Sequence, residues 1–168
     1  ENKIEYTTIM SGGGASDFGD HGSNMSRYRQ AGVSNKTRGI WAGGNPYSPG
    51  NQIQYVTIMT AGNSIDFGNL VTGRRSAAGN SGGTSSRGII GGGVSLTSPG
   101  SSGYYNYIDY FDIDTAGNGT DFGDLTIARY WVTGASNATR ATFFGGASLG
   151  PYTTRDTIDY VTIETTGN

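Results

Sequence analysis

Cysteine is absent from this chain of 168 residues, and histidine and charged residues are scarce. Without cysteine the chain can form neither disulfides nor thiolate metal sites. Its one histidine, His21, could build a histidine metal cluster or a Ser-His-Asp site only with help from a second chain. These absences exclude several catalytic chemistries, and we expect no cofactor and no metal.

Charged residues make up 14% of the chain, and the formal net charge is -2. The basic residues are spread along the chain without forming a stripe, so we expect no nucleic-acid partner. No apolar run approaches the roughly 20 residues that a membrane helix needs, so we expect no membrane insertion.

Glycine, in contrast, is abundant at 30 residues, while proline is limited to 4. The glycines have no three-residue period, which excludes collagen. Short apolar runs alternate with clusters of Gly, Ser, Asn and Thr, a pattern typical of an all-β protein with many turns.

The chain repeats itself about every 50 residues. An Ile-x-Tyr segment occurs at residues 4–9, 53–58, 108–113 and 158–163, with intervals of 49, 55 and 50 residues. An Asp-Phe-Gly triplet begins 11 residues after the tyrosine of the first three segments, at Asp17, Asp66 and Asp121. Self-similarity of this period indicates a repeat architecture.

Other landmarks recur in the same order. Each copy has a first arginine, a second arginine and a glycine pair: Arg27, Arg38 and Gly43-Gly44; Arg74, Arg87 and Gly92-Gly93; Arg129, Arg140 and Gly145-Gly146. We predict one repeat domain over residues 1–168, with copies at about 1–50, 51–103 and 104–155 and a partial copy at 156–168.

Each copy is predicted to supply four short strands. The first strand follows the first arginine, and the second runs into the glycine pair. The third strand contains Ile-x-Tyr, and the fourth centres on Asp-Phe-Gly. Gly-Asn pairs at Gly62-Asn63 and Gly117-Asn118 predict a hairpin turn between the third and fourth strands. One such sheet cannot bury both faces, but stacked copies can, and radial stacking gives a β-propeller of four-stranded antiparallel blades. The chain supplies about three blades, so we expect either a fragment of a longer array or a ring completed by other chains.

The landmarks resemble those of kelch repeats. A kelch blade has a glycine pair, a strand tyrosine, an aromatic residue and an arginine in this order, as do Gly92-Gly93, Tyr110, Phe122 and Arg129 here. The aromatic is usually tryptophan in kelch repeats and is phenylalanine in this chain. More closely, the Ile-Asp-Tyr and Asp-Phe-Gly segments resemble kelch-like repeats in virion and tail-fibre proteins of marine bacteriophages. That resemblance implies a virion or extracellular location.

The repeated polar motifs favour structural roles. The Asp-Phe-Gly triplet fits a turn whose phenylalanine enters the core, rather than a kinase magnesium site, because no other kinase motif accompanies it. Bridges such as Asp66 with Arg74 and Asp121 with Arg129 are predicted to hold the scaffold. An acidic turn explains the aspartates between residues 112 and 121 better than a calcium loop does. His21 is expected in a solvated loop.

The copies differ most between the glycine pair and the next Ile-x-Tyr segment. These links carry five tyrosines among Ser, Gly, Asn and Pro, namely Tyr47, Tyr104, Tyr105, Tyr107 and Tyr152. Tyrosine with small polar residues is typical of adaptable binding loops, which a rigid scaffold can present on one face. The same tyrosines could instead cover the edges of the sheets.

We therefore expect a non-catalytic binding or adhesion module that contacts a cell-surface receptor or glycan through these five tyrosines. Self-association, or pairing with further repeats, is also expected. Two alternatives are a purely structural spacer or decoration that assembles through its repeats, and a propeller-type enzyme acting on glycans.

Overall fold

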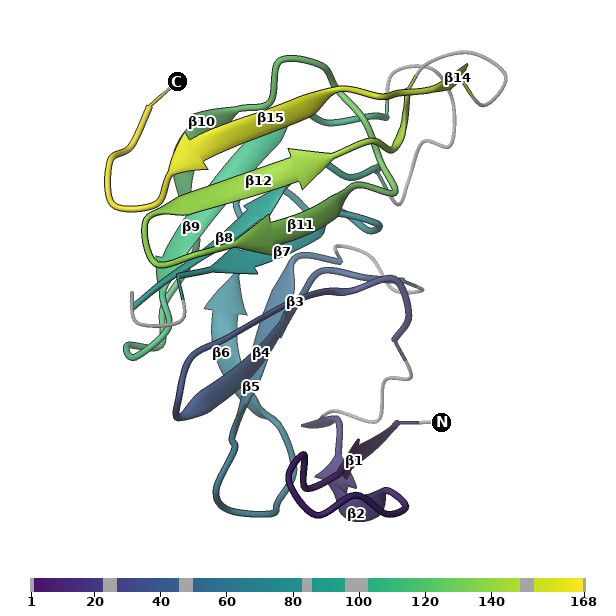
Figure 1. Cartoon of the computed structure of the whole chain (residues 1–168), viewed down its shortest axis with the longest axis vertical. Helices are drawn as coiled ribbons and strands as arrows, with labels where there is room; N and C mark the ends of the chain where they lie inside the picture. Colours follow the sequence, from purple (N-terminus) through teal and green to yellow (C-terminus); the bar gives the residue numbers. More distant parts are fainter. Residues whose placement is uncertain are drawn as a thin grey trace.

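The computed structural model describes residues 2–22, 27–45, 50–82, 86–95, 103–148 and 153–167. These residues form antiparallel strands joined by turns and loops, which confirms the all-β prediction (Figure 1). The strands are β1 (Lys3–Tyr6), β2 (Ser16–Asp20), β3 (Ala31–Ser34), β4 (Arg38–Ala42), β5 (Gln52–Thr57), β6 (Ile65–Asn69), β7 (Ala78–Ser81), β8 (Arg87–Gly91), β9 (Tyr107–Asp112), β10 (Thr120–Asp124), β11 (Thr133–Ser136), β12 (Arg140–Phe144), β13 (Ala147–Ser148), β14 (Thr153–Thr154) and β15 (Ile158–Thr162).

Two of the sheets have four strands in chain order, β3-β4-β5-β6 and β7-β8-β9-β10. A third sheet, β11-β12-β15, has three strands, and β1 pairs with β2 alone. The short hairpin β13-β14 lies in the link between β12 and β15. Each four-stranded sheet contains the four predicted kinds of strand, with the Ile-x-Tyr strand third and the Asp-Phe-Gly strand fourth, but its first two strands come from one predicted copy and its last two from the next.

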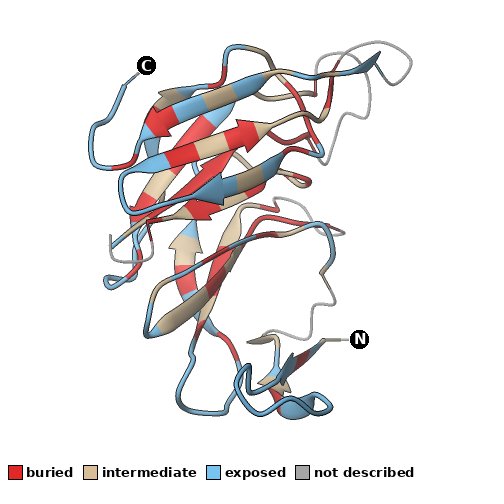
Figure 2. Cartoon of the chain, viewed as in Figure 1, coloured by how far each residue is buried: buried red, intermediate tan, exposed pale blue. Residues whose placement is uncertain are grey.

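The core lies between successive sheets, which pack face to face. Ile40, Ile53 and Phe67 of the β3–β6 sheet pack against Ile90 and Phe111 of the next sheet. A second cluster repeats this arrangement between the β7–β10 sheet and the β11-β12-β15 sheet. Buried segments therefore alternate with exposed ones along the facing strands (Figure 2). The β-branched and aromatic side chains of each Ile-x-Tyr strand drive this stacking by removing apolar surface from water.

The first strands of the three larger sheets, β3, β7 and β11, lie beside one another. Gly79 makes the close approach possible, because a Cβ at this position would collide with the carbonyl oxygen of Gly32 on β3. Serine hydroxyls join the same strands: Ser81 donates to the carbonyl of Ser34 and Ser136 to that of Ser81, each at 2.7 Å. The sheets are therefore drawn together at their first strands.

The Asp-Phe-Gly strands share one irregular pairing. In all three cases the glycine lies opposite the isoleucine of Ile-x-Tyr, and the register shifts at the phenylalanine. The bulge turns Phe18, Phe67 and Phe122 into the core, where each ring meets its strand tyrosine edge-on at 5.8–6.0 Å. The predicted core position of the phenylalanine is confirmed.

The Gly-Asn pairs do not form the predicted hairpin turn. The chain reverses earlier, where the amide of Thr60 bonds to the carbonyl of Thr57. Gly62 and Asn63 instead bind the preceding Asp-Phe-Gly strand: the Gly62 amide donates to Phe18 O at 2.7 Å, and Asn63 Oδ1 accepts from the Asp20 amide at 2.9 Å. The prediction was wrong because the loop is longer than two residues, and its tip binds the neighbouring sheet.

Candidate functional site

The site predicted from the tyrosines is described only in part. Tyr47 and Tyr152 lie outside the described residues. Tyr104 and Tyr105 lie in the link from β8 to β9 and Tyr107 is the first residue of β9, at the end of the sheet where the glycine pair Gly92-Gly93 is found. The structure therefore allows the hypothesis to be examined at this one link.

Tyr104 is half-buried and packs between two sheets. Its main chain pairs with Val94, and its ring lies 5.0 Å from that of Tyr130. Tyr130 in turn lies 4.5 Å from Trp131, whose side chain is 50% exposed. We call Tyr104, Tyr130 and Trp131 the aromatic cluster. Tyr104 is thus partly structural, and it supports the more exposed Trp131 through Tyr130.

Tyr105 and Tyr107 form a separate pair of stacked rings, with centroids 5.1 Å apart and planes 19° apart. The main chain beneath them is fixed by hydrogen bonds: the Tyr105 amide donates to Gly93 O at 2.9 Å, and Tyr107 O accepts from the Gly92 amide at 3.0 Å. Tyr107 remains 42% exposed. This stacked pair therefore offers aromatic surface on a rigid support.

Trp131 has an unusual backbone conformation, with φ at 55°. Arg29 and Ser76, which stand at the corresponding positions of the other copies, have φ of 61° and 56°. Non-glycine residues seldom adopt this left-handed conformation. Here it is held by hydrogen bonds between copies, from the Ser76 amide to Arg29 O and from the Trp131 amide to Ser76 O, each at 2.9 Å. The scaffold thus fixes the main chain at these three positions.

Tyr130 and Trp131 were not predicted from the sequence. They follow Arg129 directly, just as Tyr28 and Arg29 follow Arg27. Tyr28 is 54% exposed and pairs through its main chain with Asn45. Comparing the residues next to the repeated arginine would have revealed this aromatic position, whereas attention to the variable links alone could not.

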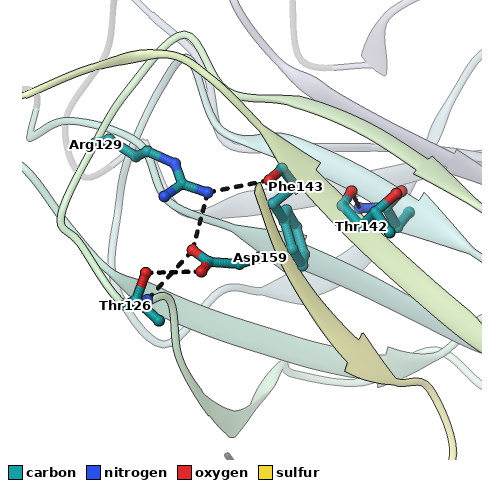
Figure 3. Close-up of polar contacts among 6 residues, drawn as sticks. Thr126, Arg129, Thr142, Phe143 and Asp159 are labelled. Atoms are coloured by element: carbon teal, nitrogen blue, oxygen red, sulfur yellow. Dashed lines mark hydrogen bonds and ion pairs between the residues drawn. The ribbon is translucent and has the colours of Figure 1, made fainter. Parts of the chain in front are cut away.

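Arg74 and Arg129 are buried scaffold residues, but the partners predicted for them, Asp66 and Asp121, are wrong. Arg129 Nη2 lies 2.9 Å from Asp159 Oδ2 and donates to Phe143 O at 3.1 Å (Figure 3). Thr126 binds the other side of the same carboxylate, with Oγ1 2.7 Å from Asp159 Oδ1. Asp121 itself is exposed.

The copy before it has the same arrangement. Arg74 pairs with Asp109 at 3.2 Å, both side chains are almost fully buried, and Asp66 is exposed. Burial lowers the pKa of Arg74, and the Asp109 carboxylate opposes this effect. The amide of Val71 also donates to Asp109 at 2.9 Å. In both copies the ion pair therefore fixes the link between two sheets to the second of them.

His21 is not in a solvated loop as predicted. It is half-buried, its Nδ1 lies 3.3 Å from Gln54 Oε1, and its ring meets that of Trp41 edge-on at 5.2 Å. The histidine therefore packs against the β3–β6 sheet, and this packing is why it is half-buried and not solvated.

The acidic turn is engaged in local hydrogen bonds. The Asp114 amide donates to the Asp112 carboxylate at 3.0 Å, and Asn35 donates to Asp114 at 2.8 Å. Within the described part of the chain, no group of three or more His, Asp or Glu residues is placed to hold a metal ion.

A groove of about 350 Å³ lies along β3, β7 and β11. Its lining includes Ser34, Ser81 and Ser136, but two of the three hydroxyls donate to main-chain carbonyls of a neighbouring strand. The groove is therefore lined mainly by small residues of three neighbouring strands, with Trp41 as its aromatic residue.

The sequence matches no protein-family model, and no curated protein is significantly similar to it. Among the residues that the structure describes, none forms an apolar helix of membrane-spanning length.

Proposed function

We propose that this chain is a segment of a kelch-like β-propeller, and that it acts as a non-catalytic binding module on a virion, such as a tail fibre, or on another extracellular surface. The propeller is supported by the repeated strand order and by the convergence of β3, β7 and β11. Sheets that approach at their first strands and stack face to face are the units from which a propeller is built.

The ligand of this module is a receptor or glycan on a cell surface. The proposal rests chiefly on Trp131 and Tyr107, two half-exposed aromatic side chains whose backbones are fixed by hydrogen bonds. A rigid aromatic ring supplies contact area while losing little conformational entropy on binding. The apolar face of a sugar ring packs well on such a surface, and the hydroxyl of Tyr107 can hydrogen-bond to its polar edge.

Two arginines stand at repeat positions related to the aromatic residues, since Arg75 corresponds to Tyr130 and Arg29 to Trp131. Arg75 Nη1 donates to Asn45 Oδ1 at 2.9 Å, and the Arg29 guanidinium lies 5.6 Å from the centroid of the Tyr28 ring. A guanidinium group binds carboxylates in a bidentate manner. Acidic glycans are therefore the subset of ligands that we would test first.

The test is a glycan array probed with the full 168-residue chain and a double variant, Tyr107→Thr with Trp131→Asn. Threonine suits a strand, and asparagine tolerates the positive φ of residue 131. The control is Tyr6→Thr, because Tyr6 is a 48% exposed tyrosine in the two-stranded sheet β1-β2.

We expect binding to fall about tenfold or more in the double variant, equivalent to about 1.4 kcal/mol, and to be unchanged in the control. Thermal denaturation of all three proteins would show whether they are folded. Equal binding by the double variant and the original chain would refute the proposed site, and binding to no glycan or cell-surface preparation would refute the proposed function.

A further inference from the structure

Asn45 joins two side chains of successive copies at the end of the sheets where the glycine pairs lie. It directly follows Gly43-Gly44 and is 7% exposed. Its Nδ2 donates to the Tyr28 hydroxyl at 3.2 Å, and its Oδ1 accepts from Arg75 Nη1 at 2.9 Å. Because both partners bind one small amide group, the Tyr28 hydroxyl and the Arg75 guanidinium lie close together. We call Tyr28, Asn45 and Arg75 the polar cluster.

The next pair of copies has an apolar cluster in the same place. Val94 corresponds to Asn45 and Tyr130 to Arg75, and Val94 and Tyr130 pack together with Ala147. An apolar cluster removes surface from water and avoids the cost of desolvating a charge. The scaffold therefore does not require polar side chains at this position, and the polar cluster needs another explanation.

The charge of Arg75 is not balanced by a carboxylate of the described residues. Arg75 is absent from the ion pairs that carboxylates form in this part of the chain, which involve Arg74, Arg87 and Arg129. The side chain of Arg75 is half-buried, and its Nε is buried without a hydrogen-bond partner among the same residues. A partly desolvated guanidinium without an anionic partner is unfavourable. A bound carboxylate would remove this penalty.

Tyr28 supplies a second donor beside Arg75. Its side chain is 54% exposed. Its oxygen accepts from Asn45, so its own proton can be donated to a ligand. The Arg29 guanidinium lies 5.6 Å from the centroid of the Tyr28 ring and adds a second positive charge. A hydroxyl donor next to a guanidinium matches the two oxygens of a carboxylate, and hydrogen bonds to a charged acceptor are the stronger kind.

We propose that the polar cluster binds the carboxylate of an acidic sugar, with one oxygen accepting from the Tyr28 hydroxyl and the other from Arg75. This inference rests on the proposed glycan binding, to which it adds the charge of the ligand and the residues that recognise it. Ser76 follows Arg75 directly, and its carbonyl accepts from the Trp131 amide at 2.9 Å. Main chains bonded in this way lie about 5 Å apart. The polar cluster and Trp131 are therefore neighbours, and one short glycan can contact both.

The first experiment compares charged and neutral forms of the same ligands. Oligosaccharides that end in glucuronic, galacturonic or sialic acid are printed on an array, each beside its methyl ester, together with neutral glycans. The array is probed with the full 168-residue chain at several concentrations. The ester keeps the sugar ring but removes the negative charge, so we expect an acid to bind at least about tenfold more tightly than its ester. Equal binding of acids and esters, or binding to neutral glycans alone, would overturn the proposal.

The second experiment tests whether the polar cluster causes the preference for acids. Arg75→Gln removes the charge but keeps an amide that can donate to Asn45, and Tyr28→Phe removes only the hydroxyl. The matched control is Arg140→Gln, which removes the same charge from an exposed arginine of β12. We expect binding of the acids to fall about tenfold in Arg75→Gln and about fivefold in Tyr28→Phe. Binding of the esters should not change in these two variants, and the control should bind as the original chain does.

Unchanged binding of the acids in Arg75→Gln and Tyr28→Phe would overturn the polar cluster as their site. Thermal denaturation establishes that the variants are folded, and the exposed position of Tyr28 makes Tyr28→Phe informative even where Arg75→Gln does not fold. The proposed function is tested separately. Glycan binding that is lost in Tyr107→Thr with Trp131→Asn, but shows no preference for acids, would support that function and overturn this inference. Binding to no glycan would refute both.

Discussion

Arg129 and Asp159 form an ion pair at 2.9 Å, with the arginine side chain fully buried and the aspartate side chain 10% exposed. Arg129 belongs to the link that leaves the β7–β10 sheet, and Asp159 to the third strand of the next sheet. The same relationship joins Arg74 to Asp109 one copy earlier. The ion pair therefore recurs in two successive copies, and in each it fixes the link between two sheets to the second of those sheets.

Removing one member of this pair should strongly destabilise the protein. In Arg129→Met the Asp159 carboxylate loses its buried partner, and we expect a cost of about 3–5 kcal/mol in the free energy of unfolding. The measurement is urea denaturation followed by far-UV circular dichroism. Arg140→Met, at an exposed arginine of the same sheet, is the control and should change stability by less than about 1 kcal/mol. Similar losses in the two variants would contradict the scaffold role of Arg129.

Gly68 should tolerate no side chain. Its φ is 148°, and a Cβ there would collide with the carbonyl oxygen of Gly117 in the next copy. We expect Gly68→Ala to destabilise the protein by about 2 kcal/mol or more, because strain and a steric conflict combine. Gly117→Ala is the matched control, since no other atom lies within 4 Å of the place its Cβ would take. The melting temperature of each variant is the readout, and an unchanged value for Gly68→Ala would show that the two copies do not pack this closely.

A comparison of Arg87 with Arg140 separates two contributions that the second arginine of the repeat makes to stability, namely its cation–π contact with a strand tyrosine and its polar contacts with Ile163 and Glu164. Each guanidinium lies 4.6 Å from the centroid of a strand tyrosine ring, Tyr110 or Tyr160. Arg87 also donates to Ile163 O in the next sheet at 3.1 Å and pairs with Glu164. We therefore expect Arg87→Gln to cost more than Arg140→Gln by about 1 kcal/mol or more, with the cation–π part common to both.

Parallel urea titrations of the two glutamine variants measure this difference. Equal destabilisation would mean that the contact with Ile163 and Glu164 contributes nothing to stability. Added salt should weaken the stabilisation from the Arg87–Glu164 ion pair more than that from the hydrogen bond to Ile163, because Glu164 is 59% exposed.

The repeat predicted much of this fold. Four strands per copy, their order and the core position of the phenylalanine follow from β-branched and aromatic periodicity and from the spacing of the landmarks. The ion-pair partners of Arg74 and Arg129 did not follow from these sequence patterns. Asp109 stands between Ile108 and Tyr110, where simple alternation predicts an exposed side chain, yet the strand is buried on both faces. Only the packing of the incoming link shows why a carboxylate is needed there.

The candidate site was predicted in part for a similar reason. Tyrosine content identified Tyr104, Tyr105 and Tyr107, but their surroundings depend on how the link before β11 crosses the end of the sheet. That path brings Tyr130 to Tyr104 and exposes Trp131. Residues 26 positions apart come into contact through strand order between copies, which local sequence patterns do not specify.

The Gly-Asn loop tips make the contacts between successive copies asymmetric. Gly62 and Asn63 satisfy the main chain of β2, and Asn118 does the same for β6, so each sheet is completed by the copy that follows it and not by the one before. Bonds of this kind join nearest neighbours only, as in other one-dimensional repeat proteins. Unfolding should therefore spread asymmetrically: loss of one sheet releases the fourth strand of its predecessor, while its successor keeps its own fourth strand capped. Amide hydrogen exchange along the chain would then show a gradient of protection with a defined polarity.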